Sequence, residues 1–167
     1  MRCWVAVAKP MEIVHMYLAR ISRVICWVRL EKHEWGDVFD IMKRPRLVRG
    51  LDDNLLMVGG LKSSLSLNAT CTTILILRLD LDTLEWDEAG RMPLDMYRCF
   101  QQSGKFKVFG AGDRVCFLAK RLGKLALWDC SWKEAANGVW RWIDGVPAYG
   151  DGLCRGFVFD ARLDAVP

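Results

Sequence analysis

One segment, residues 53–93, constrains the fold of this 167-residue chain more than any other. An apolar strand pattern leads into a glycine pair, a polar loop follows, and a second apolar strand runs through a polar turn to a tryptophan. Two adjacent residues without Cβ let the backbone bend at a strand end and let neighbouring strands approach closely. The parts are residues 55–58, Gly59 and Gly60, residues 62–73, residues 74–81, residues 82–83 and Trp86. This order predicts a small sheet of short antiparallel strands.

The tryptophans indicate that such a unit recurs. Trp35, Trp86 and Trp140 lie 51 and 54 residues apart, and each follows a strand pattern and a polar turn. A proline stands seven residues after Trp86 and seven after Trp140, and Trp142 shares a strand face with Trp140 by its two-residue spacing. Self-similarity at about 50 residues is typical of repeat folds in which each unit packs on its neighbours. The predicted units are residues 25–45, 46–93 and 94–147, with the start of a further unit at 148–167.

Five segments, taken together, resemble the C-terminal kelch region of plant F-box/kelch-repeat proteins. The resemblance covers about residues 25–163. It implies an all-β fold, a partial kelch-type β-propeller of about three four-stranded antiparallel blades. The segments are LLMVGG (55–60), LDTLEWDEAGRMP (81–93), LALWDC (125–130), VWRWIDGVP (139–147) and RGFVFDARL (155–163).

The resemblance also implies a function. Members of that family carry an N-terminal F-box that docks a Skp-type adaptor of a cullin ubiquitin ligase, and the propeller presents a target for ubiquitination. No F-box pattern precedes the repeats here, so a Skp-type adaptor is expected as a partner only if an F-box is supplied elsewhere. The expected function is a protein-interaction module similar to the target-recognition propeller of an SCF-type E3 ubiquitin ligase subunit. Two alternatives remain open: a small-molecule or glycan-binding propeller, and a truncated, non-functional or regulatory fragment of a longer protein.

Residues 1–24 support two readings. From Ile13 to Val28 the apolar positions follow helical spacing, which predicts a short N-terminal helix. The repeat instead requires a strand ahead of Trp35. We therefore expect a strand from about Arg23 onward and, upstream of it, either a short helix or a strand that completes the first blade.

Composition narrows the class of partner. The chain is 52% hydrophobic and 26% charged, which is ordinary for a soluble globular protein, and its net charge is +4. That charge is too small to require a nucleic acid or a membrane surface, and neither is expected. An array of three blades would leave two apolar flanks open, which predicts self-association.

The cysteines and histidines indicate the compartment and argue against a metal site. The seven cysteines are odd in number and form no C-x-x-C pair, which favours reduced thiols in the cytoplasm or nucleus. The two histidines, His15 and His33, are too few for a typical zinc site. No metal and no cofactor are expected.

Candidate catalytic groups are scarce. Both histidines lie in the first 33 residues, far from any nucleophile motif, and no phosphate-binding or calcium-binding loop pattern occurs. Asp80 and Asp82 share a strand face by their spacing, but a solvated strand end explains them better than an acid/base pair. We expect no enzyme activity.

Large or charged side chains in expected loops are the candidate partner contacts. Lys62 falls in the loop of the second unit, and PLDMYRCFQQ (93–102) connects that unit to the next. Large apolar residues in that connection either pack between blades or form part of a contact surface. The candidate contact residues are Lys62, Met96, Tyr97, Arg98, Tyr149 and Asp151.

Overall fold

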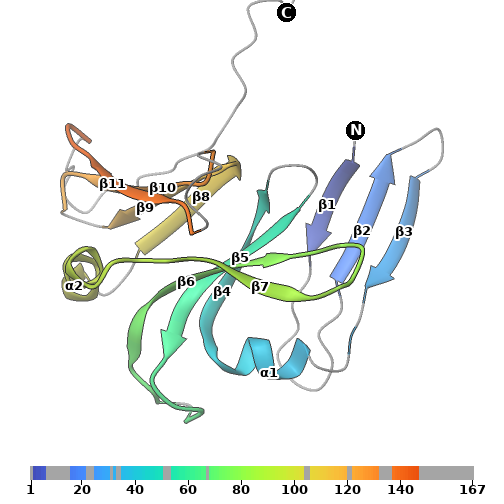
Figure 1. Cartoon of the computed structure of the whole chain (residues 1–167), viewed down its shortest axis with the longest axis horizontal. Helices are drawn as coiled ribbons and strands as arrows, with labels where there is room; N and C mark the ends of the chain where they lie inside the picture. Colours follow the sequence, from blue (N-terminus) through green and yellow to red (C-terminus); the bar gives the residue numbers. More distant parts are fainter. Residues whose placement is uncertain are drawn as a thin grey trace, which may run out of the picture.

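The chain is built mostly from β-strands, as expected (Figure 1). The computed structural model describes residues 2–6, 16–21, 25–30, 32, 35–50, 54–66, 68–103, 106–119, 122–131 and 137–146. Among these residues the helices are α1 (Trp35–Asp40) and α2 (Leu94–Ser103). The strands are β1 (Arg2–Ala6), β2 (Met16–Ile21), β3 (Ile25–Leu30), β4 (Met42–Gly50), β5 (Leu55–Lys62), β6 (Cys71–Leu79), β7 (Trp86–Arg91), β8 (Phe106–Gly112), β9 (Arg114–Ala119), β10 (Leu125–Asp129) and β11 (Val139–Ile143).

The N-terminal region forms a three-stranded sheet in the order β1-β2-β3, with both pairings antiparallel. The strand expected from about Arg23 is described from Ile25, and of the two alternatives upstream of it, the described residues form strands and not a helix. Helical spacing over a short apolar run does not separate a helix from a buried strand. The aromatic and β-branched residues of β2 and β3 favour the extended form.

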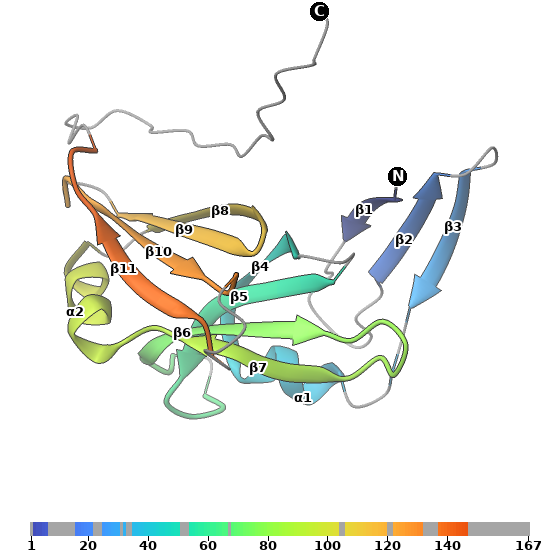
Figure 2. The same ribbon diagram turned by 45° about the horizontal axis from the view of Figure 1, so that its top comes forward.

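Strands β4 to β11 form one sheet from two antiparallel halves. We call β4–β7 the first unit and β8–β11 the second unit; within each, every strand pairs with the next along the chain. The halves meet through a short parallel contact between β4 and β8, in which Arg49 pairs with Ala111 and Gly50 with Gly112. Figures 1 and 2 place the first unit between the N-terminal sheet and the second unit.

The main core lies between the two units. One face of β5 and β6 packs, together with α2, against one face of β9 and β10. Phe100 of α2 stacks on Trp142 with ring centroids 5.9 Å apart and also contacts Phe106 and Phe117 edge-on. The fully or nearly fully buried members include Leu56, Val58, Ile74, Ile76, Met92, Phe100, Val115, Phe117, Ala126 and Trp128.

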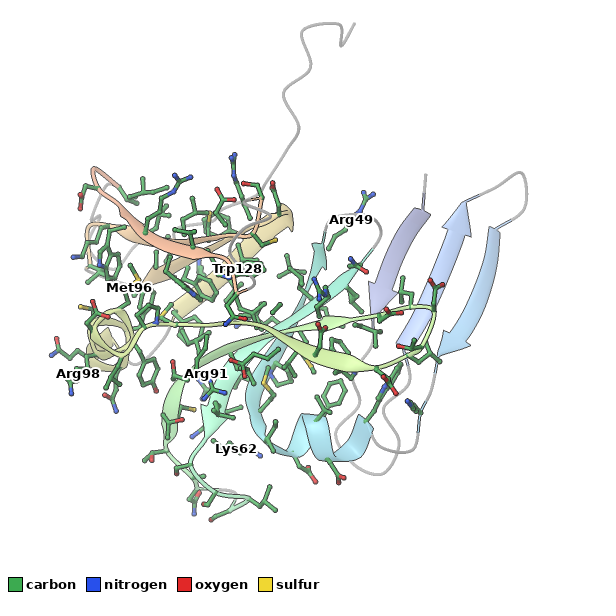
Figure 3. The ribbon with its side chains drawn as sticks, viewed as in Figure 1. Arg49, Lys62, Arg91, Met96, Arg98 and Trp128 are labelled. Atoms are coloured by element: carbon green, nitrogen blue, oxygen red, sulfur yellow. The ribbon has the colours of Figure 1, made fainter. Side chains whose placement is uncertain are left out.

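Trp128 joins the two units at one point (Figure 3). Its side chain is 1% exposed, and its indole nitrogen donates to the carbonyl of Asn137 at 3.0 Å. Gly90 of β7 and Gly138 lie so close to this ring that a Cβ at either position would overlap the indole nitrogen. Gly138 also has a φ of 67°, which disfavours other residues.

The first unit is covered on its second face as well. Helix α1 packs there. Trp35 clusters with Leu55 and Leu79, and Met42 clusters with Met57 and Leu77. Because both faces are covered, residues 55–60 and 73–77 are buried without a break. Continuous apolar runs such as LLMV and ILIL are typical of strands buried on two sides.

The second unit has one covered face and one face that is covered only in part among the described residues. In β9, Val115, Phe117 and Ala119 are buried in the core, while Cys116 and Leu118 between them are only half-buried. Because side chains alternate along a strand, the register of β8–β11 places a second set of residues on the other side. We call this the outer face of the second unit; it consists of Lys107, Phe109, Arg114, Cys116, Leu118, Leu125, Leu127, Asp129, Val139, Arg141 and Ile143.

The repeat tryptophans do not all have the same surroundings. Trp86 opens β7 opposite Leu79, and Trp140 lies in β11 opposite Trp128, so both have the same register in their units. Trp35 instead begins α1, where its indole nitrogen donates to the carbonyl of Leu84 at 3.0 Å and its ring meets Trp86 edge-on. A residue that follows a strand need not enter another strand.

The unit boundaries differ from the predicted ones. The first unit runs from Met42 to Arg91 rather than from 46 to 93, and the second, with α2, runs from Leu94 to Ile143. Residues 25–45 form no unit of their own, because β3 belongs to the N-terminal sheet and β4 opens the first unit. The predicted further unit, 148–167, lies outside the described residues.

Candidate protein-interaction surface

Helix α2 is fixed to one end of the first unit. Just before the helix, the amide of Met92 donates to the carbonyl of Ile74 at 2.9 Å, and the hydroxyl of buried Thr73 donates to the carbonyl of Met92 at 2.8 Å. Pro93 then precedes the helix, and Asp95 in its first turn is favourable near the positive end of the helix dipole. These bonds hold the helix against the start of β6.

The buried side of α2 corrects two of the expected contact residues. Met96 and Tyr97 are each only 7% exposed and belong to the core between the units. The Tyr97 hydroxyl donates to the carbonyl of Cys71 at 2.9 Å, and burial, with a smaller effect of Cys71, raises the pKa of this phenol. Both residues have packing roles, because the connection that was expected to be a loop folds as an amphipathic helix.

The other side of α2 faces solvent. Leu94 is 56% exposed, and Arg98 is exposed and extends away from the helix (Figure 3). Gln101 and Gln102 are also exposed. This side of the helix therefore offers an apolar group, a guanidinium and two amides to a partner.

The loop between β5 and β6 lies at the same end of the first unit. The amide of Ser63 donates to the carbonyl of Thr70 at 2.9 Å, which closes the loop, and Lys43 donates to the carbonyl of Ala69 at 3.1 Å. Leu65 within the loop is 74% exposed. These bonds order a loop that presents an apolar side chain to solvent.

The structure brings Lys62 and α2 to the same place. Lys62, the last residue of β5, pairs with Cys71, whose carbonyl accepts the Tyr97 hydroxyl. Lys62 is half-buried at the strand end instead of within the loop. We call this group the helix-end surface; it consists of half-buried Lys62 and the exposed residues Leu65, Leu94, Arg98, Gln101 and Gln102. Tyr149 and Asp151, the other candidate contacts, lie outside the described residues.

A charged cluster that the sequence did not reveal lies on the second unit. Asp129, at the end of β10, is 2% exposed, and its Oδ2 accepts a hydrogen bond from Arg114 at 3.1 Å and from Arg141 at 3.1 Å. Its Oδ1 accepts from the amide and the hydroxyl of Ser131. Burial alone would raise the pKa of Asp129, but the bonds from Ser131 and Arg114 outweigh it, so its pKa lies below the ordinary value.

The first unit has an acidic residue at the equivalent position, with different partners. Asp80 follows the third strand of the first unit, as Asp129 ends the third strand of the second, and Asp80 accepts the amides of Asp82 and Thr83. These two bonds lower the pKa of Asp80. The Asp80–Asp82 pair therefore forms a turn, in agreement with the reading as a strand end.

The described residues offer little for metal or membrane chemistry. In this part of the chain, no three His, Cys, Asp or Glu side chains are grouped so that they could hold a metal ion. Its helices are also too short or too polar to cross a lipid bilayer.

One known protein is closely similar to the chain. SKP1-interacting partner 15 of Arabidopsis thaliana is 71% identical over 142 residues, which cover 84% of this chain and 36% of that protein. The chain thus spans about a third of the length of this relative. No protein-family model matches the chain, and no solved structure matches it.

Proposed function

We propose that this chain is a target-recognition module of an SCF-type ubiquitin ligase subunit, with no catalytic activity of its own. The observation that carries the proposal is the 71% identity to a protein named for its interaction with SKP1. Because the matched region is 36% of that protein, we assign contact with the Skp-type adaptor to the rest of the longer protein. We assign target binding to the β-rich region that this chain contains. We expect the protein to act in the cytoplasm or nucleus.

We also propose that the first and second units are two neighbouring blades of a kelch-type β-propeller. Each unit is a four-stranded antiparallel sheet, and the two pack face to face through a shared core. Their first strands, β4 and β8, run parallel and touch, as expected of the innermost strands of adjacent blades around an axis. The equal register of Trp86 and Trp140 supports the same reading.

The helix-end surface is the proposed target contact. Loops at the ends of propeller blades often carry binding residues on a rigid scaffold. Arginine is among the residues that contribute most to protein interfaces, and this surface offers Arg98. Leu65 and Leu94 add exposed apolar area that a partner can bury. Lys62 adds a second cation, which favours a target segment that is acidic and apolar.

The test compares the tagged chain with a Lys62→Glu/Arg98→Glu variant in plant cells. If two hot-spot contacts are lost, each worth about 2 kcal/mol, capture of the bound target should fall more than about tenfold. The matched control is Asp82→Lys, a charge reversal in the turn at the opposite end of β6, and it should capture the target normally. A loss with both variants, or with neither, would contradict the assignment of this surface.

Turnover of the captured target tests the ligase role separately. When this chain is overproduced and does not contact the adaptor, it should compete for the target with a ligase subunit that does. The half-life of the target should then lengthen. The helix-end variant should not lengthen it. A captured protein whose turnover is unaffected by the chain and by inhibition of cullin ligases would make the chain a binding module of another kind.

A further inference from the structure

The last strand of the second unit, β11, lies at one end of the large sheet. It pairs with β10 in an unbroken antiparallel register, and among the described residues no strand pairs with its other side (Figure 2). Such an edge carries a row of backbone N–H and C=O groups with which another extended chain can pair. The sequence of β11, VWRWI, is β-branched and aromatic apart from one arginine, and these residue types favour an extended backbone.

The first unit ends in a different kind of edge. Its last strand, β7, has a register shift against β6 between Ile76 and Leu77. Three of its six residues are charged, Asp87, Glu88 and Arg91, and all three take part in ion pairs. Bulges and charges are the usual means by which an edge strand avoids pairing with another chain. Strand β7 has both protections, whereas β11 has a regular register and a single charge.

The two tryptophans of β11 fix the strand on its inner side. The Trp140 ring lies 5.3 Å from the ring of Phe117, and the Trp142 ring stacks on Phe100 at 5.9 Å, measured between ring centroids. The ammonium group of Lys124 lies 4.1 Å from the centroid of the same Trp142 ring. Because these contacts already order the strand, a chain that binds to its edge loses less conformational freedom than one that binds to a loop.

The outer side of β11 presents one cationic group between two apolar groups. Val139 and Ile143 are 42% and 39% exposed, and the side chain of Arg141 between them is 52% exposed. Nη2 of Arg141 donates to buried Asp129 at 3.1 Å, and a guanidinium has five N–H donors, so this bond leaves others for a partner. Asp129 also accepts from Arg114, so two guanidiniums share one carboxylate and the cluster keeps an excess positive charge. The complementary group is a carboxylate.

We propose that β11 accepts an extended segment of a partner protein as a further antiparallel strand, with an acidic residue of that segment opposite Arg141. Side chains directly opposite in such a pair have Cβ atoms about 5 Å apart, so the acid and the guanidinium can meet. Two residues before and two after the acid, apolar side chains of the segment cover Val139 and Ile143. This binding mode is strand addition, and it depends neither on the helix-end surface nor on the ligase role.

The charge argues against a second copy of the chain as the occupant. Antiparallel pairing of two β11 strands, with Val139 of each opposite Ile143 of the other, would place the two Arg141 side chains directly opposite each other. Like charges in that position destabilise a strand pair. An acidic partner segment has no such cost.

Peptide titrations test strand addition. The probe is a synthetic nine-residue peptide with the central sequence Val-Thr-Glu-Thr-Val, added to the full chain, and amide hydrogen exchange in β11 is followed by NMR. At about ten times the Kd of the peptide, exchange of the β11 amides that point away from β10 should slow about tenfold, because these amides exchange only from the free chain. No slowing at up to about 1 mM peptide would overturn the proposal.

Methylated peptides separate strand addition from other modes of binding. Two versions of the probe are N-methylated at alternate amides, one version on each edge of the extended peptide. Only one edge pairs with β11, so one version should bind and the other should not. Equal binding of both versions would overturn the proposal.

Matched arginine variants test the acid contact. Replacing the central glutamate of the probe by lysine should weaken binding to the native chain about tenfold. Arg141→Gln should remove this preference. Arg114→Gln is the matched control and should keep it, because this change also takes one guanidinium from Asp129 but lies two strands away from the edge. Loss of the preference in both variants, or in neither, would overturn the assigned contact. Slower β11 exchange at higher protein concentration without peptide would show that a second copy occupies the edge, which would also overturn the proposal.

Discussion

The first and second units share a strand order but differ in how many of their faces are covered. The first unit has the second unit and α2 on one face and α1 on the other, and residues 55–60 and 73–77 of its central strands are buried without a break. The second unit is covered on one face, and β9 alternates between buried and partly exposed residues. The comparison teaches that the same topology needs a different hydrophobic pattern according to the number of layers around it.

The largest expected effect comes from truncating equivalent residues in the two units. Ile76 pairs with Val58, and Leu125 pairs with Leu118 in the same register, but Ile76 is 0% exposed and Leu125 is half-buried. Ile76→Ala should lower the free energy of unfolding by about 2–5 kcal/mol. Leu125→Ala, at a half-buried position, should lower it by about 1 kcal/mol. Urea denaturation measures both, and equal losses would break the comparison.

Asp129 should contribute more to stability than its equivalent Asp80. Asp129→Asn removes the charge that two arginines share and should cost about 1–3 kcal/mol at pH 7. Asp80→Asn, at an exposed turn, should cost less. The free energies of unfolding of both variants and the native chain, from urea titrations, give the two losses.

The pH dependence of the Asp129 effect has a defined sign. Because the folded pKa is lowered, the carboxylate stabilises the fold fully above its ordinary pKa of about 3.9. That stabilisation is lost as the pH falls through the lower folded pKa. The difference between the native chain and Asp129→Asn should therefore be constant from neutral pH down to about pH 5 and shrink below about pH 4. A difference that shrank near neutral pH would contradict the lowered pKa.

Two adjacent residues of α2 have different expected roles: buried Tyr97 stabilises the fold, and exposed Arg98 is a proposed binding residue. Tyr97→Phe removes the hydrogen bond to Cys71 and should cost about 0.5–1.5 kcal/mol of stability. Arg98→Ala, one residue later and exposed, should change stability by less than about 0.5 kcal/mol. Thermal unfolding of the two variants checks this, and a larger loss for Arg98→Ala would place that side chain in the fold instead of at the surface.

The smallest expected effect is that of the cross-strand ion pair of the first unit. Arg78 Nη2 lies 2.6 Å from Asp87 Oδ2, and both side chains are about half exposed, so a double-mutant cycle should give a coupling of less than about 1 kcal/mol. In the second unit Leu127 and Arg141 occupy these positions, and no such coupling is expected. The coupling in the first unit should decrease further in about 1 M salt, and one that did not would indicate a less solvated pair.

The sequence predicted the strands better than the elements between them. The apolar runs at 55–58 and 74–77 and the alternating run at 115–118 mark strands, because burial on one or two faces leaves a direct pattern. Residues 94–103 are predicted as a connection, because Pro93 ends the preceding strand pattern, and the helical spacing of Met96, Tyr97 and Phe100 is the signal that this prediction misses. Their helix depends on packing against both units, which only the assembled fold provides.

The candidate surface could be predicted only in part. Lys62 and Arg98 could be named as candidate contacts from the sequence, because both are charged and lie at a strand end or in a short segment between strands. Their role in binding stays a prediction. Met96 and Tyr97 looked equivalent to Arg98 along the chain, and only the orientation of the helix separates the buried side from the exposed one. The Asp129 cluster was missed because its partners, Arg114 and Arg141, come from two strands whose register the sequence does not state.

The indole of Trp128, held between Gly90 and Gly138, has a consequence for how this protein can change over evolutionary time. A methyl group at either glycine would have to displace the ring, and with it the spacing of the two sheets. Gly90, Trp128 and Gly138 therefore constrain one another through the spacing between the two sheets. A larger residue at one of these positions would be tolerated only together with a matching change at another. Exposed turns of the same strands carry no such restriction, and natural variants should accumulate there first.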